Sequence, residues 1–69
     1  MNEREIFING AVLQTRAPTL QALLLERGFA MDAAFACAVN NTFVPRPHWP
    51  QQPLQAGDRV DVIAPITGG

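Results

Sequence analysis

The sequence has 69 residues and a formal net charge of −1, which is enough chain for one small domain. Apolar residues make up 48% of the chain and charged residues only 16%, which excludes a disordered chain and favours a globule with its own core. The five basic residues, all arginines, are scattered without forming a run, so we expect no nucleic-acid partner.

No stretch of the sequence approaches the roughly 20 apolar residues that span a membrane. The opening residues 1–5 are too acidic to begin a secretory signal, so we expect a cytoplasmic protein with no membrane partner. A lone cysteine, Cys37, excludes a disulfide within the chain, and no neighbouring ligand residues accompany it to suggest a metal site.

A β-hairpin over residues 5–14 is the first predicted element. Asn9-Gly10 favours the positive φ angles of a two-residue turn between two short apolar runs. Side chains alternate between the faces of a strand, so one face of this hairpin is wholly apolar. That face consists of Ile6, Ile8, Ala11 and Leu13. The opposite face carries an apolar pair, Phe7 and Val12, between polar ends.

A helix over residues 19–27 should follow the hairpin. Thr19 is a suitable N-cap, Gly28 is a suitable stop, and three leucines between them recur at helical spacing. This leucine stripe needs an apolar surface, and the apolar face of the hairpin is the nearest one. We therefore expect the helix and the hairpin to pack together.

The second half of the chain predicts strands separated by an irregular connection. Residues 34–40 alternate like a largely buried strand, and residues 42–44 form a short return strand. Four prolines between positions 45 and 53 prevent regular ladder pairing, so we expect this segment to be irregular and pinned by Trp49.

A turn at residues 55–58 leads into the last predicted strand, residues 59–66. Its alternation places one set of apolar side chains on a common face. They are Val60, Val62, Ala64 and Ile66. The order of elements predicts an α+β domain over residues 1–66 with one helix, followed by a flexible tail of residues 67–69.

Several short segments, none specific alone, resemble the thiamine-pathway sulfur carriers of the ThiS family as a set. They are Val39-Asn40-Asn41, Val44-Pro45-Arg46 with Trp49, Leu54 with Gly57-Asp58, and the terminal Gly68-Gly69. Together with the hairpin and the helix they span nearly the whole chain. The resemblance implies a β-grasp fold, in which a mixed sheet of four or five strands wraps around one main helix and the first and last strands pair in parallel.

The resemblance also implies a carrier rather than an enzyme. An adenylyltransferase related to the ubiquitin E1 enzymes, of the ThiF type, would use ATP to adenylate the Gly69 carboxylate. A sulfur donor protein would then form a thiocarboxylate, and thiazole synthase, of the ThiG type, would take the sulfur. No cofactor is expected on the carrier itself. Gly68 and Gly69 suit this chemistry because a tail without side chains can thread a narrow channel.

A partner interface is predicted from apolar side chains outside the expected core. Phe7 and Val12 face away from the helix, and Ile63, on the outer side of the last strand, is expected beside them. Ile66 and Thr67 would extend this interface towards the tail. The alternative is a set of ordinary exposed apolar residues, which are common on protein surfaces.

Other functions stay open at this point. The proline-containing ending, residues 64–69, also resembles MoaD, the small subunit of molybdopterin synthase, although the Val44-Pro45-Arg46 and Trp49 segment favours the thiamine family. A ubiquitin-like protein modifier would need the same Gly-Gly end, whereas a simple interaction module would not.

The remaining polar and aromatic candidates are interpreted as structural. Cys37 sits in an apolar strand without a base, and His48 lies between two prolines without a partner, so neither is assigned chemistry. Trp49 is expected to cover a sheet edge and Arg46 to pair with a carboxylate. Asp58 should complete the turn that follows Gly57.

Overall fold

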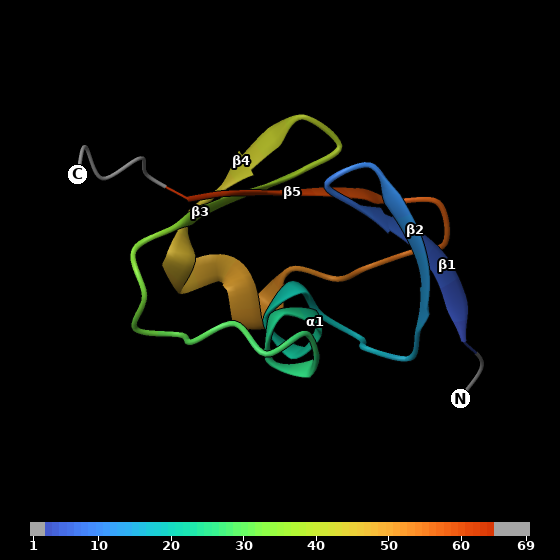
Figure 1. Cartoon of the computed structure of the whole chain (residues 1–69), viewed down its shortest axis with the longest axis horizontal. Coiled ribbons are helices and arrows are strands. Elements are labelled where there is room, and N and C mark those ends of the chain that lie inside the picture. Colours follow the sequence, from blue (N-terminus) through green and yellow to red (C-terminus); the bar gives the residue numbers. More distant parts are fainter. Residues whose placement is uncertain (1–2, 65–69) are drawn as a thin grey trace.

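The computed structural model describes residues 3–64, and Figure 1 shows the arrangement of the elements. The elements are β1 (Arg4–Ile8), β2 (Ala11–Thr15), α1 (Leu20–Glu26), β3 (Ala36–Val39), β4 (Thr42–Val44), the 3₁₀ helix η1 (Arg46–Gln51) and β5 (Arg59–Ile63). The strands form one five-stranded sheet in the order β2-β1-β5-β3-β4. This mixed sheet with one main helix confirms the α+β architecture expected from the sequence.

The predicted hairpin is confirmed in its turn and in its register. Asn9 and Gly10 have φ angles of 49° and 83°, as a two-residue turn of this kind requires. Phe7 of β1 lies opposite Val12 of β2, and Ile6 lies opposite Leu13. The two faces of the hairpin are therefore divided as the alternation predicted.

β5 lies at the centre of the sheet and runs parallel to β1, as the resemblance implied. Ile8 pairs with Val60 on this side, while β3 pairs antiparallel with β5 on the other. The side chains of two turn asparagines also hold β5. Asn9 Oδ1 accepts a hydrogen bond from the Val62 N–H at 2.8 Å, and Asn40 Oδ1 accepts one from the Arg59 N–H at 3.0 Å.

Helix α1 is capped as its sequence predicted. Thr19 Oγ1 accepts a hydrogen bond from the Ala22 N–H at 3.2 Å, and Gly28 ends the helix with a φ of 87°. In Figure 1, α1 and η1 lie on one side of the sheet, and within residues 3–64 no element covers the other side. The core between the helix and the sheet consists of Ile6, Ala17, Leu20, Leu23, Leu24, Cys37, Val39, Val44, Trp49, Leu54 and Val60.

Two predicted strand boundaries were wrong. β3 begins at Ala36 rather than at position 34, and β5 ends at Ile63 rather than at Ile66. Ile63 pairs with the first residue of β3, so within the described chain the ladder has no partner strand beyond it. Residues 65–69, and with them the predicted start of the tail, lie outside the described residues.

The segment between β4 and β5 is more regular than predicted, because η1 occupies most of it. A proline at the first turn of a helix is tolerated, since its missing N–H would have no partner there. Trp49 is buried with 1% of its surface exposed, and its Nε1 donates to the Val44 carbonyl at 2.9 Å. The prediction that Trp49 pins this segment is confirmed, although Trp49 lies in the core beneath the edge strand β4.

Arg46 does not pair with a carboxylate, and that prediction was wrong. Its guanidinium instead donates to the backbone carbonyls of Met31, Ala33 and Phe35, with distances of 2.7 Å to Ala33 and 3.1 Å to Phe35. These carbonyls belong to the loop before β3, where they have no strand partner and need other donors. Five donors in a rigid fork allow one arginine to serve all three.

The same guanidinium lies over two aromatic rings, which explains why it is held in one place. Its central carbon is 4.4 Å from the centroid of Trp49 and 5.1 Å from that of Phe35, within the range of cation–π attraction. The two rings also stack on one another, with centroids 5.1 Å apart. Arg46 therefore joins η1 to the loop before β3.

Replacing Arg46 should destabilise the fold even though the side chain is exposed. We expect Arg46→Lys to lower the free energy of unfolding by about 1–2 kcal/mol, because an ammonium group cannot stack on the rings while donating to several carbonyls. Urea unfolding followed by circular dichroism measures this change. Arg16→Lys, at an exposed position before α1, is the matched control, and an equal effect of the two variants would contradict the assigned role of Arg46.

Candidate functional site

Phe7 and Val12 lie side by side on the outer face of the sheet, as the sequence predicted. They are direct cross-strand partners in β1 and β2. Phe7 is half-buried, whereas Val12 has 55% of its surface exposed. The pair is therefore open to a partner on the side of the sheet away from α1.

Ile63 does not lie beside this pair, and that expectation was wrong. The parallel register places Arg59 next to Phe7, and Ile63 is four residues further along β5, at about 13 Å for an extended strand. Arg59 and Asp61 occupy the outward positions in between. The sequence reveals that Ile63 faces outward, but the neighbour of Phe7 depends on the register between distant strands.

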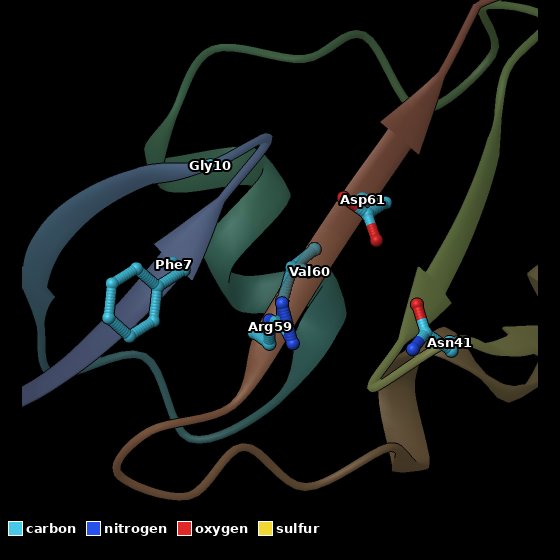
Figure 2. A pocket seen from close by; sticks show the side chains of 6 residues that line it. All are labelled: Phe7, Gly10, Asn41, Arg59, Val60 and Asp61. Atoms are coloured by element: carbon cyan, nitrogen blue, oxygen red, sulfur yellow. The ribbon is translucent and has the colours of Figure 1, made fainter.

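A polar hollow replaces the expected continuous apolar patch. It has a volume of about 400 Å³ and is lined by Phe7, Gly10, Asn41, Arg59, Val60 and Asp61. Figure 2 shows the side chains of Arg59 and Asp61 on β5 between Phe7 on one side and Asn41 on the other. A cation, a carboxylate and an amide therefore line the outer face at this point.

Ile63 instead belongs to a second hollow, which we call the strand-end pocket. It has a volume of about 500 Å³ and is lined by Ala34, Phe35, Ala36, Arg46 and Ile63. Ala36 and Ile63 are cross-strand partners, and 58% of the surface of Ile63 is exposed. This pocket is mainly apolar and lies where β5 ends.

Sequence analysis did not assign Ala34, Phe35 or Ala36 to a surface pocket, and it did not single out Phe43 as an exposed aromatic residue. Ala38 of β3 lies opposite Phe43 of β4, and Phe43 has 64% of its surface exposed. The signal available in the sequence was the recurrence of alanine at positions 34, 36 and 38. Small outward side chains beside large ones leave a depression in the surface. Gly68, Gly69, Ile66 and Thr67 lie outside the described residues, so their assigned roles stay predictions.

Cys37 is a core residue, as predicted, and its thiol is not exposed at all. Burial raises the pKa of the Cys37 thiol to about 11, although the positive charge of Arg46 acts in the opposite direction. A thiol with this pKa is protonated near neutral pH and is a poor nucleophile. Cys37 is the only cysteine of the chain, and its thiol is therefore unsuited to sulfur transfer.

Asp58 completes the turn before β5, as predicted. One carboxylate oxygen accepts from the Gln55 N–H at 2.8 Å and the other from Asn40 Nδ2 at 3.1 Å. His48 is exposed on η1. Within residues 3–64, no group of three or more His, Cys, Asp and Glu residues is placed to hold a metal ion. Nor does this part of the chain contain a helix that is long and apolar enough to cross a membrane.

Comparison with known proteins identifies similar chains. The family model described as the ThiS family matches residues 3–69. The sulfur carrier protein ThiS of Escherichia coli (strain K12) is 34% identical over 65 residues, which cover 94% of this chain and 98% of that protein. The crystal structure of the thiamine biosynthesis protein ThiS from Geobacter metallireducens matches with a TM-score of 0.80 at 18% identity, covering 94% of this chain and 99% of that one. This structural match confirms the β-grasp fold.

The raised pKa of Cys37 predicts a loss of stability at alkaline pH. The thiol has a pKa of 9.0 when unperturbed and about 11 in the folded protein, so the stabilisation is complete below pH 9 and is lost as pH rises to about 11. We expect a loss of about 2–3 kcal/mol in the free energy of unfolding over this interval. Urea unfolding at several pH values measures it.

The composition of the chain leaves Cys37 as the one side chain expected to titrate in this pH interval. It contains neither lysine nor tyrosine, so no other side chain has its ordinary pKa between 9 and 11. Cys37→Ala is the control, and its free energy of unfolding should be nearly independent of pH in this interval. Equal pH dependence in the two proteins would refute the assignment to Cys37.

Proposed function

The chain belongs to the ThiS family of sulfur carriers, and on that premise we propose that it carries sulfur as a thiocarboxylate on Gly69 for thiazole formation in thiamine biosynthesis. The observation that carries the proposal is that the family match extends through the Gly68-Gly69 end and covers nearly all of a β-grasp domain. In this proposal the chain is a co-substrate, and the catalytic groups belong to its partners.

The chemistry begins at the terminal carboxylate. An E1-like adenylyltransferase of the ThiF type binds the carrier and ATP, and a Gly69 carboxylate oxygen attacks the α-phosphorus, forming an acyl-adenylate and releasing pyrophosphate. A sulfur donor protein then delivers sulfur to the Gly69 carbonyl carbon, and AMP leaves with the electron pair of the broken C–O bond. Thiazole synthase of the ThiG type receives the sulfur from the resulting thiocarboxylate.

Two properties of the described residues support this division of labour. Cys37 is buried and its pKa is raised, so its sulfur does not compete with the terminal carboxylate as the carrier atom. Hydrogen bonds hold both edges of β5 as far as Val62, which is seven residues before Gly69. The last residues of the chain therefore follow directly from a well-supported strand. A rigid support lowers the entropy lost when a partner binds the end of the chain.

The family match favours the thiamine pathway over the alternatives. It names ThiS rather than MoaD, although both would use the same thiocarboxylate chemistry. Protein modification would require the same activation of Gly69 but transfer to an amine, whereas the family model and the Escherichia coli relative are both described as ThiS.

The decisive experiment is alkylation followed by intact-mass measurement. A Cys37→Ala version is incubated with the adenylyltransferase from the same genome, ATP and a sulfide source, and a thiol-directed alkylator is then added. We expect one label that maps to Gly69, because replacement of oxygen by sulfur creates the only alkylatable thiol-like group. Alanine is chosen at position 37 because the side chain is fully buried and a serine hydroxyl would need a partner there.

The control is the same protein with one alanine added after Gly69, which should remain unlabelled because the added residue displaces the carboxylate. Absence of label on the unextended protein would contradict the proposal, provided that the adenylyltransferase is active on another carrier.

The Phe7 and Val12 pair is proposed to contribute to binding of the adenylyltransferase. We expect Phe7→Asp to raise the KM for the carrier about 10-fold, because a carboxylate replaces the ring on a half-buried outward position. Gln14→Asp adds the same charge to the same face of the hairpin and should change KM little. Initial rates of pyrophosphate release measure both, and an unchanged KM for Phe7→Asp would remove this pair from the interface.

A further inference from the structure

We propose that Arg59 is a specificity-determining residue of the carrier, because it supplies a positive charge within reach of the activated Gly69 end without an amine that this end could acylate. The inference rests on the proposed function, in which Gly69 passes through an acyl-adenylate. It also gives a chemical reason for a feature of the whole sequence, since all five basic residues are arginine and none is lysine.

The acyl-adenylate on Gly69 is open to nitrogen nucleophiles as well as to sulfur. A neutral lysine amine would attack the Gly69 carbonyl carbon and form a C–N bond. AMP would leave with the electron pair of the broken C–O bond, and the amine would release a proton to solvent. The product is an amide, which can no longer accept sulfur. A guanidinium is delocalised and stays protonated in proteins, so it does not enter this reaction.

The described structure does not require a guanidinium at three of the five arginines. Arg4 and Arg46 use theirs to donate to backbone carbonyls. The side chains of Arg16, Arg27 and Arg59 are exposed, and among residues 3–64 no hydrogen bond involves their guanidinium groups. A lysine could carry the same charge in water at these positions. The fold therefore does not explain the choice of arginine there, whereas the reactivity of an amine does.

Arg59 is the arginine of β5, the strand that leads into the tail. It faces outward beside Phe7, and Figure 2 shows its side chain between Phe7 and Asn41. Ala64 lies five positions further, about 17 Å along an extended strand, and the five residues that follow it to Gly69 span at most about 18 Å. A tail folded back over the outer face would therefore reach position 59, even before the length of the side chain is counted.

The domain of the carrier is the one protein surface that accompanies its activated end into every complex. A group joined to Gly69 through a short stretch of chain has an effective concentration in the millimolar range. The adenylyltransferase must also leave the Gly69 carbonyl accessible to the sulfur donor, so it cannot exclude all other nucleophiles. An unreactive cation at position 59 removes this competitor from the carrier itself.

Position 16 provides a matched control that the tail cannot reach. Arg16 directly follows β2, whose last residue pairs with Arg4, three residues before Phe7. Because Phe7 lies beside Arg59, the start of β1 is about 10 Å behind Arg59 along the strands, and Ala64 is about 17 Å ahead of it. The resulting separation of about 27 Å exceeds the span of the tail.

Intact-mass measurement of the activated full chain tests the proposal. The wild type, Arg59→Lys and Arg16→Lys are each incubated with the adenylyltransferase from the same genome and ATP, without a sulfur source. We expect Arg59→Lys to lose one water by forming an amide between the introduced amine and Gly69, at a level at least about 10-fold above that of Arg16→Lys. The wild type should show no such loss, and tandem mass spectrometry of proteolytic fragments locates the bond.

A second variant separates the added amine from the lost guanidinium. Arg59→Gln removes the charge without introducing an amine. With a sulfide source and the thiol-directed alkylator, in the Cys37→Ala background, we expect Arg59→Gln to be labelled on Gly69 as completely as the parent protein. Arg59→Lys should be labelled less, because part of it is diverted into the amide.

The possible results separate this inference from the proposed function. Labelling of the parent protein without any amide in Arg59→Lys overturns the inference alone. Equal amide formation in Arg59→Lys and Arg16→Lys also overturns it, because reach from the end of β5 would then not matter. Failure of Arg59→Gln to be labelled overturns it too, since Arg59 would then act through its charge. No labelling of the parent protein by an adenylyltransferase active on another carrier overturns the proposed function and this inference together.

Discussion

The insertion of β5 between β1 and β3 is the constraint on which the other features of this domain depend. Without it the β1-β2 and β3-β4 hairpins would be separate, and each would expose a second edge and one apolar face. Backbone bonds join β1 to this strand and to the turn before it, from the Phe7 N–H to the Asp58 carbonyl and from the Asn9 N–H to the Val60 carbonyl, each at 2.9 Å. Val60 is thereby buried in the same core cluster as the leucines of α1.

The same strand organises the surface. Its inward residue Val60 is buried, and its outward residues are Arg59, Asp61 and Ile63, so one strand contributes charged groups near its beginning and an apolar group at its end. A shift of one residue in the register would exchange these two sets. The outer face is therefore divided into a polar hollow beside Phe7 and an apolar pocket at the end of β5.

The proline-rich segment has a structural task that also shapes the strand-end pocket. Trp49 fills the core beneath β4, and Arg46 links η1 to the loop before β3 through three backbone carbonyls. Such a connection compensates for the few backbone bonds that a segment rich in proline can make. Because Arg46 and Phe35 also line the strand-end pocket, the contacts that stabilise the fold also shape this part of the surface.

The sequence by itself determined the features that depend on neighbouring residues. Asn9-Gly10 defines its turn, Thr19 and Gly28 bound the helix, and alternation assigns Phe7 and Ile63 to the outer face, because these signals arise from local backbone geometry and side-chain periodicity. Only the tertiary structure decided that Arg59 lies beside Phe7, that Arg46 binds carbonyls and that β5 ends at Ile63. Each of these depends on which distant segments meet and at which register, and neither the spacing nor the chemistry of adjacent residues specifies that.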